Sequence, residues 1–267
     1  MLVKIHYHII EHHNIIMKLD NFPKILWINL NQSVDRRKYM NNLIGNYFSN
    51  IRIPAVNGFD ENVINETCIQ NSKLSPQENA CTCSHITAIR YFLENTQESR
   101  VVVFEDDVSF DFLKMIPFDW SEFESNLPLN YSVIQLAVSC DRGGITDIKL
   151  VPINIESKSY CSTAYLISRR GAQEIIDKYL FVNGKLDLSS QTYATADSMI
   201  ANTNACYSIP IFTYQTTNSL IHPYHLPLHV KSKVQQFKLW KNCFDNLKTF
   251  NKQKFLENIK SCCVIQV

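Results

Sequence analysis

The sequence has very little glycine and lacks the glycine-rich motifs of several large enzyme classes. Only six of its 267 residues are glycine, and none of them forms G-x-G-x-x-G or G-x-x-x-x-G-K-S/T. The phosphate-binding loops of dinucleotide enzymes and P-loop NTPases are therefore excluded as motifs. The chain also lacks an excess of charge of one sign, because 26 basic residues face 25 acidic ones. A protein that binds nucleic acid through bulk electrostatics would be far more basic, so we expect no nucleic-acid partner.

Long apolar runs are absent as well. No window approaches 18 uncharged apolar residues, so we expect no transmembrane segment. His, Lys and Glu interrupt the N-terminal stretch where a secretory signal peptide needs an unbroken apolar run. The nine cysteines are then expected to be thiols in a reducing compartment, and we expect a cytoplasmic location or a virion. With 45% hydrophobic and 19% charged residues, the composition is close to that of ordinary folded proteins. It therefore excludes the class of disordered tail proteins.

Strand and helix patterns alternate along the chain. Apolar runs rich in β-branched residues predict strands at 24–30, 51–56, 100–104, 131–138, 161–168 and 207–215. Helical spacing predicts helices at 33–47, 75–95, 171–180 and 193–201. The helix at 75–95 has the strongest start, with Ser75 as the cap, Pro76 at the first position and Glu78 completing a capping box. The alternation predicts one α/β domain with a largely parallel sheet, in which Pro210 marks an edge or irregular strand.

The C-terminal region is strongly basic. Residues 231–260 hold eight Lys and two acidic residues, with apolar side chains at helical spacing: Val234, Phe237, Trp240, Phe244 and Leu247. One interpretation, which we favour, is a helix that packs this stripe on the domain and leaves its lysines in water. The other is peripheral contact with an anionic membrane surface or an acidic partner. We therefore expect a dispensable leader at 1–22, a domain at 23–228 and a C-terminal basic amphipathic helix at 229–267.

Three adjacent carboxylates follow the predicted strand at 100–104. Glu105, Asp106 and Asp107 repel one another unless a cation neutralises them. In extended backbone Glu105 and Asp107 point the same way, as is needed to bind one ion. Carboxylate oxygens suit Mg²⁺ and Mn²⁺, and ligands of open α/β sheets bind at the carboxyl ends of strands. The pattern predicts a divalent metal at Glu105 and Asp107, with an acidic loop that binds no metal as the alternative.

Five segments match one known family in order and spacing. They are Ile28-Asn29-Leu30 with Ser33, Asp35, Arg36 and Arg37; 53–58; Ser75 to Phe92 with Glu78, Cys81, Ser84 and His85; 103–108; and 163–168 with Gly171-Ala172 and Ala196-Asp197. Over about residues 24–220 the chain resembles glycosyltransferase family 25, which includes lipooligosaccharide and procollagen galactosyltransferases. The resemblance implies a GT-A type fold, a nucleotide-sugar donor, a divalent metal and inversion at the sugar carbon. The chain departs from the family pattern at Ala80, where glycine is usual, and at Asn57, where Asp is commoner.

Eight residues are candidates for binding the donor: Asn29, Leu30, Arg36, Arg37, Asn57, Ser84, His85 and Asp106. The resemblance places the nucleoside at Asn29 and Leu30, and we expect Asp106 to contact the ribose or to position its neighbours. Arg36 and Arg37 carry fork-shaped donors that suit phosphate oxygens, and the choice between them stays open.

Histidines and cysteines are further candidates for metal ligands. The loop around His222 follows the last predicted strand, so we propose His222 as a third ligand, with His225 in reserve, since imidazole suits Mn²⁺ better than Mg²⁺. The alternative is a pair of surface histidines. Cys81, Cys83 and His85 do not predict zinc, because their spacing matches no common structural site and a fourth ligand is missing.

The function that the resemblance implies is transfer of a hexose, galactose or glucose, from a UDP-sugar to an acceptor hydroxyl. The acceptor is a glycan or a hydroxylysine-type protein side chain. Inversion needs a general base near the acceptor, and Asp197 is the leading candidate, with Asp141 in reserve. A metal-dependent phosphohydrolase and a catalytically silent module that binds a sugar or a partner protein remain the alternatives.

Overall fold

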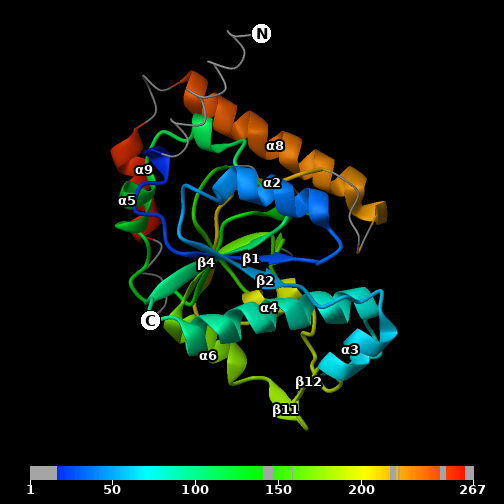
Figure 1. Ribbon diagram of the computed structural model, residues 1–267. Helices are drawn as coiled ribbons and strands as arrows, with labels where there is room; N and C mark the ends of the chain where they lie inside the picture. Colours follow the sequence, from blue (N-terminus) through cyan, green and yellow to red (C-terminus); the bar gives the residue numbers. More distant parts are fainter. Residues whose placement is uncertain are drawn as a thin grey trace.

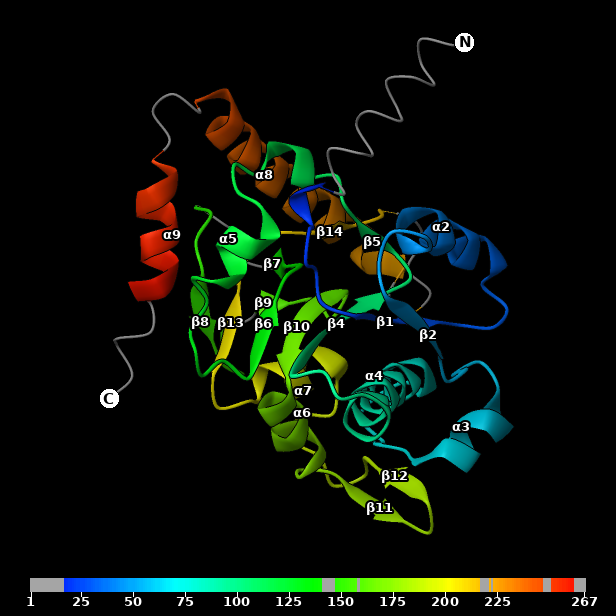
Figure 2. The same ribbon diagram turned by 60° about the vertical axis from the view of Figure 1, so that its left-hand side comes forward.

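A seven-stranded sheet forms the centre of the computed structural model, which describes residues 17–140, 147–157, 159–216, 221, 223–246 and 251–261. Helices cover both faces of the sheet (Figures 1 and 2). From one edge to the other its strands are β2 (Asn50–Pro54), β1 (Ile25–Asn29), β4 (Arg100–Glu105), β10 (Ala164–Ser168), β6 (Val133–Gln135), β13 (Cys206–Ser208) and β8 (Val151–Ile153).

The sheet is mixed: five of its seven strands run in one direction and two, β10 and β8, run against them, so the predicted largely parallel sheet is confirmed for most strands but missed these two. β1 is parallel to β2 and β4, and β13 is parallel to β6. β10 is antiparallel to both β4 and β6, and β8 is antiparallel to β13. Parallel neighbours need a long crossover, usually a helix. In the described chain between β6 and β10 there is no helix, and β7 (Ser139–Cys140) and β9 (Ser159–Tyr160) pair with each other instead.

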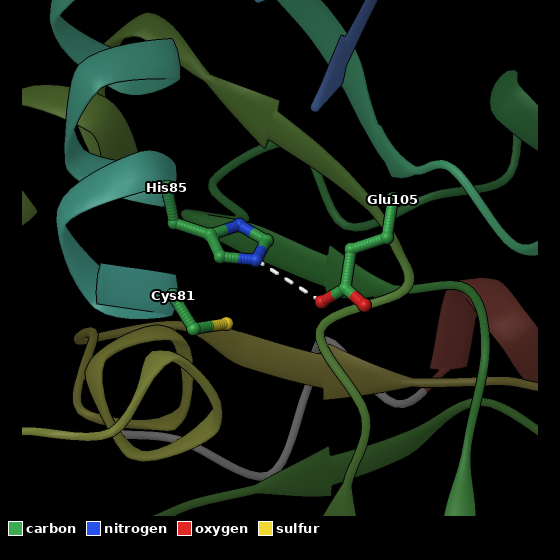
Figure 3. A group of neighbouring side chains, drawn as sticks. All are labelled: Cys81, His85 and Glu105. Carbon is green, nitrogen blue, oxygen red and sulfur yellow. Dashed lines mark hydrogen bonds and ion pairs between the residues drawn. The ribbon is translucent and has the colours of Figure 1, made fainter. Parts of the chain in front are cut away.

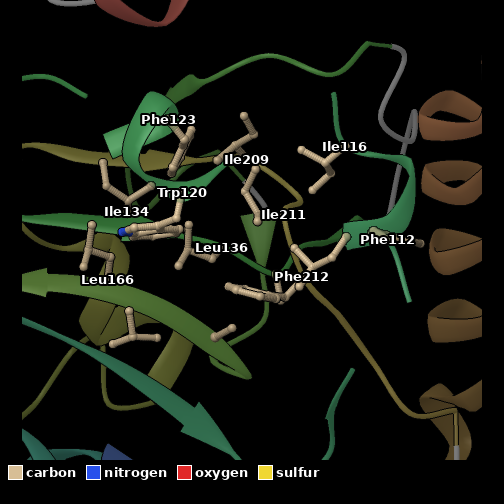
Figure 4. Close-up of a cluster of buried hydrophobic side chains, with 14 of the residues drawn as sticks. Phe112, Ile116, Trp120, Phe123, Ile134, Leu136, Leu166, Ile209, Ile211 and Phe212 are labelled. Carbon is tan, nitrogen blue, oxygen red and sulfur yellow. The ribbon is translucent and has the colours of Figure 1, made fainter. Parts of the chain in front are cut away.

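Alternate residues of the central strands enter two separate cores. Ile25 and Trp27 of β1 belong to one core, which α2 (Val34–Ile44), α5 (Trp120–Glu124) and α8 (Leu226–Asp245) cover. Its side chains include a cluster of aromatic rings around Trp120 and Phe212 (Figure 4). Leu26 and Ile28 enter the second core, under α4 (Pro76–Asn95), α6 (Arg169–Ile176) and α7 (Ala196–Ala201). The central strands are therefore packed against helices on both faces of the sheet.

Helix α4 forms as predicted. The Ser75 side chain accepts a hydrogen bond from the Glu78 backbone N–H, and the Glu78 carboxylate accepts one from the Ser75 N–H at 2.8 Å, which completes the capping box. The helix ends at Asn95, as expected. Its buried face carries Phe92 into the second core and places His85 level with the carboxyl ends of the strands.

The predicted strand at 207–215 is two strands. β13 ends at Ser208 and β14 (Thr213–Tyr214) pairs with β5 (Val108–Ser109), while Pro210 lies between them. Proline has no N–H to donate to a ladder, which explains the break. β13 itself lies inside the sheet, between β6 and β8, so of the two predicted alternatives the irregular strand is confirmed and the edge strand is not.

A second, smaller sheet lies beside α4. It consists of β11 (Leu180–Val182), β12 (Lys185–Asp187) and β3 (Cys68–Ile69), preceded by α3 (Glu61–Thr67). The remaining short elements are η1 (Leu113–Met115) and η2 (Pro223–His225). Among the described residues no helix has the length and apolar content to cross a membrane.

The C-terminal region contains two helices, α8 and α9 (Lys252–Ser261), rather than the one predicted. The buried residues of α8 are Ser232, Gln236 and Trp240, and the partly buried Leu239 and Cys243 also pack against the first core. Val234 and Phe237 are exposed, so the predicted inward stripe is wrong except at Trp240, and Leu247 lies outside the described residues. The polar Gln236 faces inward because its amide donates to the Val138 carbonyl at 2.7 Å.

We expect Gly171→Ala to lower the free energy of unfolding by about 2–3 kcal/mol. A Cβ at Gly171 would lie 2.1 Å from the backbone oxygen of Ser132, so α6 would have to move off β6. The matched control is Gln173→Ala on the exposed side of the same helix, which should change stability by less than about 0.5 kcal/mol. Urea unfolding measures both; equal midpoints for the two variants would contradict the close approach.

Candidate functional site

Two adjoining cavities lie at the carboxyl ends of β1 and β4. The smaller cavity, of about 130 Å³, lies between these strand ends, the chain after β2 and the N-terminal half of α4. The larger cavity, of about 580 Å³, lies between residues 161–163, the start of α7 and the start of α8. Cys81, Glu105 and Ile221 line both cavities. A ligand that spans the two would therefore pass Glu105.

Asp106 is bound on both of its oxygens. Asn29 at the end of β1 donates to one at 2.6 Å, and Arg36 of α2 donates to the other at 2.7 Å. The side chains of Asn29, Arg36 and Asp106 all line the smaller cavity. Through these two hydrogen bonds, Asp106 fixes the guanidinium of Arg36 and the amide of Asn29 at the cavity wall.

Two more arginines donate hydrogen bonds to the side chain of Asn29. Arg37 and Arg52 donate from Nε to the side-chain oxygen of Asn29 at 3.3 and 3.0 Å, and neither lines the smaller cavity. Burial, together with the charge of Arg37, lowers the pKa of Arg52. The geometry therefore separates the two predicted arginines: Arg36 faces the cavity, and Arg37 orients Asn29.

The chain after β2 is pinned to α4 by a serine. The Ser84 hydroxyl accepts from the Val56 N–H at 2.9 Å and donates to the Ala80 carbonyl at 2.7 Å. Ser84, Val56 and Leu30 line the smaller cavity. Asn57 does not line it, and its side-chain oxygen instead accepts from the Phe59 N–H within a turn.

Glu105 is held as an anion by a buried network. Its Oε1 accepts from the Ser162 hydroxyl at 2.6 Å and lies 3.1 Å from His85 Nε2 (Figure 3). The other nitrogen of His85 lies 3.1 Å from the Tyr165 hydroxyl. Burial acts to raise the pKa of Glu105, but hydrogen bonds and charge from His85, Ser162 and Arg36 outweigh it and hold that pKa below its usual value.

Asp107 is the carboxylate with an unsatisfied atom. Its Oδ1 is buried and has no hydrogen-bond partner among the described residues, and its Oδ2 lies 3.8 Å from Arg36. Burial, with the neighbouring charge of Glu105, raises the pKa of Asp107 to about 7. A buried oxygen without a partner calls for an explanation, and a hard cation shared with Glu105 would supply one. Glu105 and Asp107 therefore fit the predicted divalent metal.

A softer set of ligands lies beside them. Cys81 Sγ, a nitrogen of His85 and an oxygen of Glu105 all lie within 4.8 Å of one another (Figure 3). Cys83 is not part of this group, because its side chain is buried against Cys68. Burial and the surrounding carboxylates raise the pKa of the Cys81 thiol well above its usual value. In the metal-free site Cys81 is therefore a thiol.

Asp197 lines the larger cavity. Its carboxylate accepts from the Cys161 N–H at 2.9 Å, and burial raises its pKa. Cys161 has a φ of 117°, a strained conformation for a residue other than glycine. A carboxylate with a raised pKa is a stronger base than an exposed one, which is the property that deprotonation of a hydroxyl needs.

Two predicted residues lie outside the described part of the chain, namely Asp141 and His222. Next to His222, Ile221 lines both cavities, and the reserve ligand His225 lines the larger one. The roles proposed for Asp141 and His222 stay predictions.

Three residues of the site were not predicted: Arg52, Ser162 and Tyr165. Arg52 could have been found from strand register, because pairing of 24–30 with 51–56 places it opposite Trp27. Tyr165 stands in a segment that the family resemblance had already marked. Ser162 has no signal in the sequence, since its contact with Glu105 depends on β10 lying next to β4.

Comparison with known proteins adds a family and little else. A solved structure titled "Crystal Structure of A197 from STIV" aligns with a TM-score of 0.39 and 11% identity, covering 72% of this chain and 84% of that one, and a likeness this low carries no argument. No curated protein matches the chain. The family described as glycosyltransferase family 25 (LPS biosynthesis protein) matches residues 22–190, which include β1, α4, the three carboxylates and β10. The chain therefore belongs to glycosyltransferase family 25.

Proposed function

We propose that the protein transfers a hexose, galactose or glucose, from a UDP-sugar to an acceptor hydroxyl with inversion, on a GT-A type arrangement. Family 25 membership indicates a glycosyltransferase. The observation that carries the finer proposal is the shared wall of the two cavities. Glu105 lines both, with the unsatisfied oxygen of Asp107 on one side and the basic carboxylate of Asp197 on the other. A donor in the smaller cavity and an acceptor in the larger one would meet there.

On the donor side, the chain offers apolar and cationic groups in one cavity. Leu30 and Val56 provide apolar contact for a nucleoside near the end of β1. Arg36, fixed by Asp106, provides a guanidinium for the diphosphate oxygens. Asn29 is fixed by hydrogen bonds, so it can hold its orientation while a ligand binds.

Glu105 and Asp107 are the residues that would hold Mn²⁺ or Mg²⁺, with His222 as the proposed third ligand. When bound, such an ion offsets the charge that develops on a departing diphosphate. His85 and Ser162 keep Glu105 ionised and oriented toward that position.

On the acceptor side, Asp197 would accept the proton of the attacking hydroxyl. Its contact with the Cys161 N–H fixes the carboxylate in the wall of the larger cavity. Tyr224 and His225 line the same cavity and are suited to pack against a sugar ring. We propose a glycan or hydroxylysine-type acceptor, with Asp141 as the reserve base.

A panel of UDP-sugars incubated with the protein and Mn²⁺ tests the proposal. A transferase releases UDP and free sugar slowly by donor hydrolysis, and transfers the sugar once an acceptor is added. Release of inorganic phosphate would instead indicate a phosphohydrolase. A thermal shift without turnover would indicate a binding module.

We expect Asp107→Asn to reduce metal-dependent donor hydrolysis by more than about 100-fold, because one of two carboxylate ligands is lost. The fold should persist, since Oδ1 of Asp107 makes no hydrogen bond to any described group. Asp177→Asn, at the exposed end of α6, is the matched control and should keep full activity. Metal titration of initial rates measures the effect, and a curve that overlays that of the parent protein would exclude Asp107 as a ligand.

The raised pKa of Asp107 predicts that the stability of the protein in metal-free buffer depends on pH. The pKa of Asp107 is about 7 in the folded protein, whereas the ordinary value of 3.8 applies to the unfolded chain. The folded state therefore binds the proton of Asp107 more tightly than the unfolded state does. Stability contributed by this group is therefore lost as pH rises from about 4 to 7. In EDTA, the free energy of unfolding of Asp107→Asn should exceed that of the parent by on the order of 2 kcal/mol at pH 8, and by much less at pH 4.5. A difference that does not vary with pH would contradict the raised pKa.

We expect Asp197→Asn to lower transfer by about 10²–10⁴-fold with little effect on donor binding. The amide preserves the hydrogen bond from Cys161 but cannot take a proton at neutral pH. Transfer rates with labelled donor and calorimetric UDP binding measure the two effects. A parallel loss of donor affinity would make Asp197 a sugar-binding residue instead.

A further inference from the structure

Helix α8 presents apolar side chains to the outside. Val230, Val234, Phe237 and Phe244 are 41%, 48%, 41% and 46% exposed. Their spacing places them along one side of the helix, as a ridge about the length of α8. No described residue buries this ridge. Exposed apolar side chains that gather in a row mark an interaction surface, whereas single ones need no explanation.

The outward orientation is fixed by the side of the helix that faces the domain and adjoins the ridge. Trp240 is fully buried and donates from its indole N–H to the Pro210 carbonyl at 2.7 Å. Gln236 donates to the Val138 carbonyl at 2.7 Å and to the Ser232 hydroxyl at 2.9 Å. Rotating α8 to bury the ridge would break these contacts and leave buried polar groups unpaired. The helix is therefore held with Trp240, the hydrogen-bonded polar groups and the partly buried Leu239 and Cys243 inward, and with phenylalanine and valine side chains outward.

Basic residues accompany the ridge. Lys231, Lys238 and Lys241 are exposed and lie on the outward side of α8, within or beside the apolar row. Asp245 is the one acidic residue of α8, and it pairs with Lys241 at 2.7 Å. Lysines that border an exposed apolar row can reach the headgroups of an anionic bilayer while the apolar side chains enter its interface.

We propose that the outward face of α8, comprising Val230, Lys231, Val234, Phe237, Lys238, Lys241 and Phe244, docks on an anionic lipid surface. A second copy of the chain fits this face poorly, because a two-fold contact would bring the lysines of both copies together. The lysines beside the apolar row complement the negative headgroups of such a surface, while the apolar side chains can enter its acyl region. Docking needs no donor or metal and so does not depend on the proposed function.

The docked face and the larger cavity share one element. Leu228 and His229, near the start of α8, line that cavity, and Tyr224 lines it while being exposed. Docking through α8 would therefore bring the proposed acceptor cavity close to the lipid surface. On the basis of the proposed function, this favours an acceptor glycan carried at a membrane.

Sedimentation with vesicles tests the docking. The full chain is mixed with vesicles of phosphatidylcholine alone, or with 30% phosphatidylglycerol, at about 0.1 M and 0.5 M salt. We expect binding to the anionic vesicles that weakens at high salt, and little binding to neutral ones. Absence of binding to the anionic vesicles would overturn the proposal, as would binding only to an acidic polypeptide such as polyglutamate.

Two double variants separate the apolar and the basic parts of the face. Val234→Ser with Phe237→Ser, and Lys231→Glu with Lys238→Glu, should each lower the partition coefficient at least tenfold. The matched controls are Leu180→Ser in the exposed β11 and Lys73→Glu before α4, which should bind like the parent. Circular dichroism and donor hydrolysis without vesicles confirm that each variant is folded.

Unchanged vesicle binding in either double variant would overturn the assignment to α8. Concentration-dependent dimerisation that the Val234→Ser and Phe237→Ser pair abolishes would also overturn it, because the face would then be a contact between copies. Loss of vesicle binding with intact donor hydrolysis supports the docking. A protein that docks but does not turn over UDP-sugars would count against the proposed function alone.

Discussion

Mutual repulsion among three consecutive carboxylates at the end of β4 is the constraint around which the site is arranged. The fold gives each carboxylate a different environment. Glu105 is held by His85 of α4, and Asp106 by Arg36 of α2. Asp107 keeps a buried oxygen that no described group satisfies. The electrostatic cost is thereby concentrated on one carboxylate instead of being shared by three, and that carboxylate is the one best able to gain from a cation.

This division of partners couples the site to both cores. Helix α2 packs on one face of the sheet through Met40 and Ile44, and α4 packs on the other through Ile89 and Phe92. The two helices therefore approach β4 from opposite sides and fix its terminal charges from opposite sides. Because close-packed cores transmit small shifts, a substitution deep in either core is felt at the carboxylates.

Structural features that depend on neighbouring residues could be predicted from the sequence, whereas contacts between distant residues could not. The start of α4 could be predicted because Ser75 and Glu78 cap the helix within four residues. The contact of Ser162 with the carboxylates could not, because it depends on β10 entering the sheet antiparallel beside β4. The apolar spacing in α8 predicted the wrong face, because Gln236 and Trp240 find partners about 100 and 30 residues away in the sequence. Hydrophobic periodicity indicates which residues share a face of a helix, but not which face is covered.

A three-residue segment sets the relation between the two halves of the site. Cys161 binds Asp197 through its N–H, and Ser162 binds Glu105 through its hydroxyl. The Thr163 carbonyl accepts from the Glu105 N–H at 2.8 Å. The segment therefore fixes the proposed base relative to the proposed metal ligand, across the wall that the two cavities share. Its strained start, the positive φ of Cys161, is held by the hydrogen bond to Asp197, so the strained backbone and the proposed base are coupled through one contact.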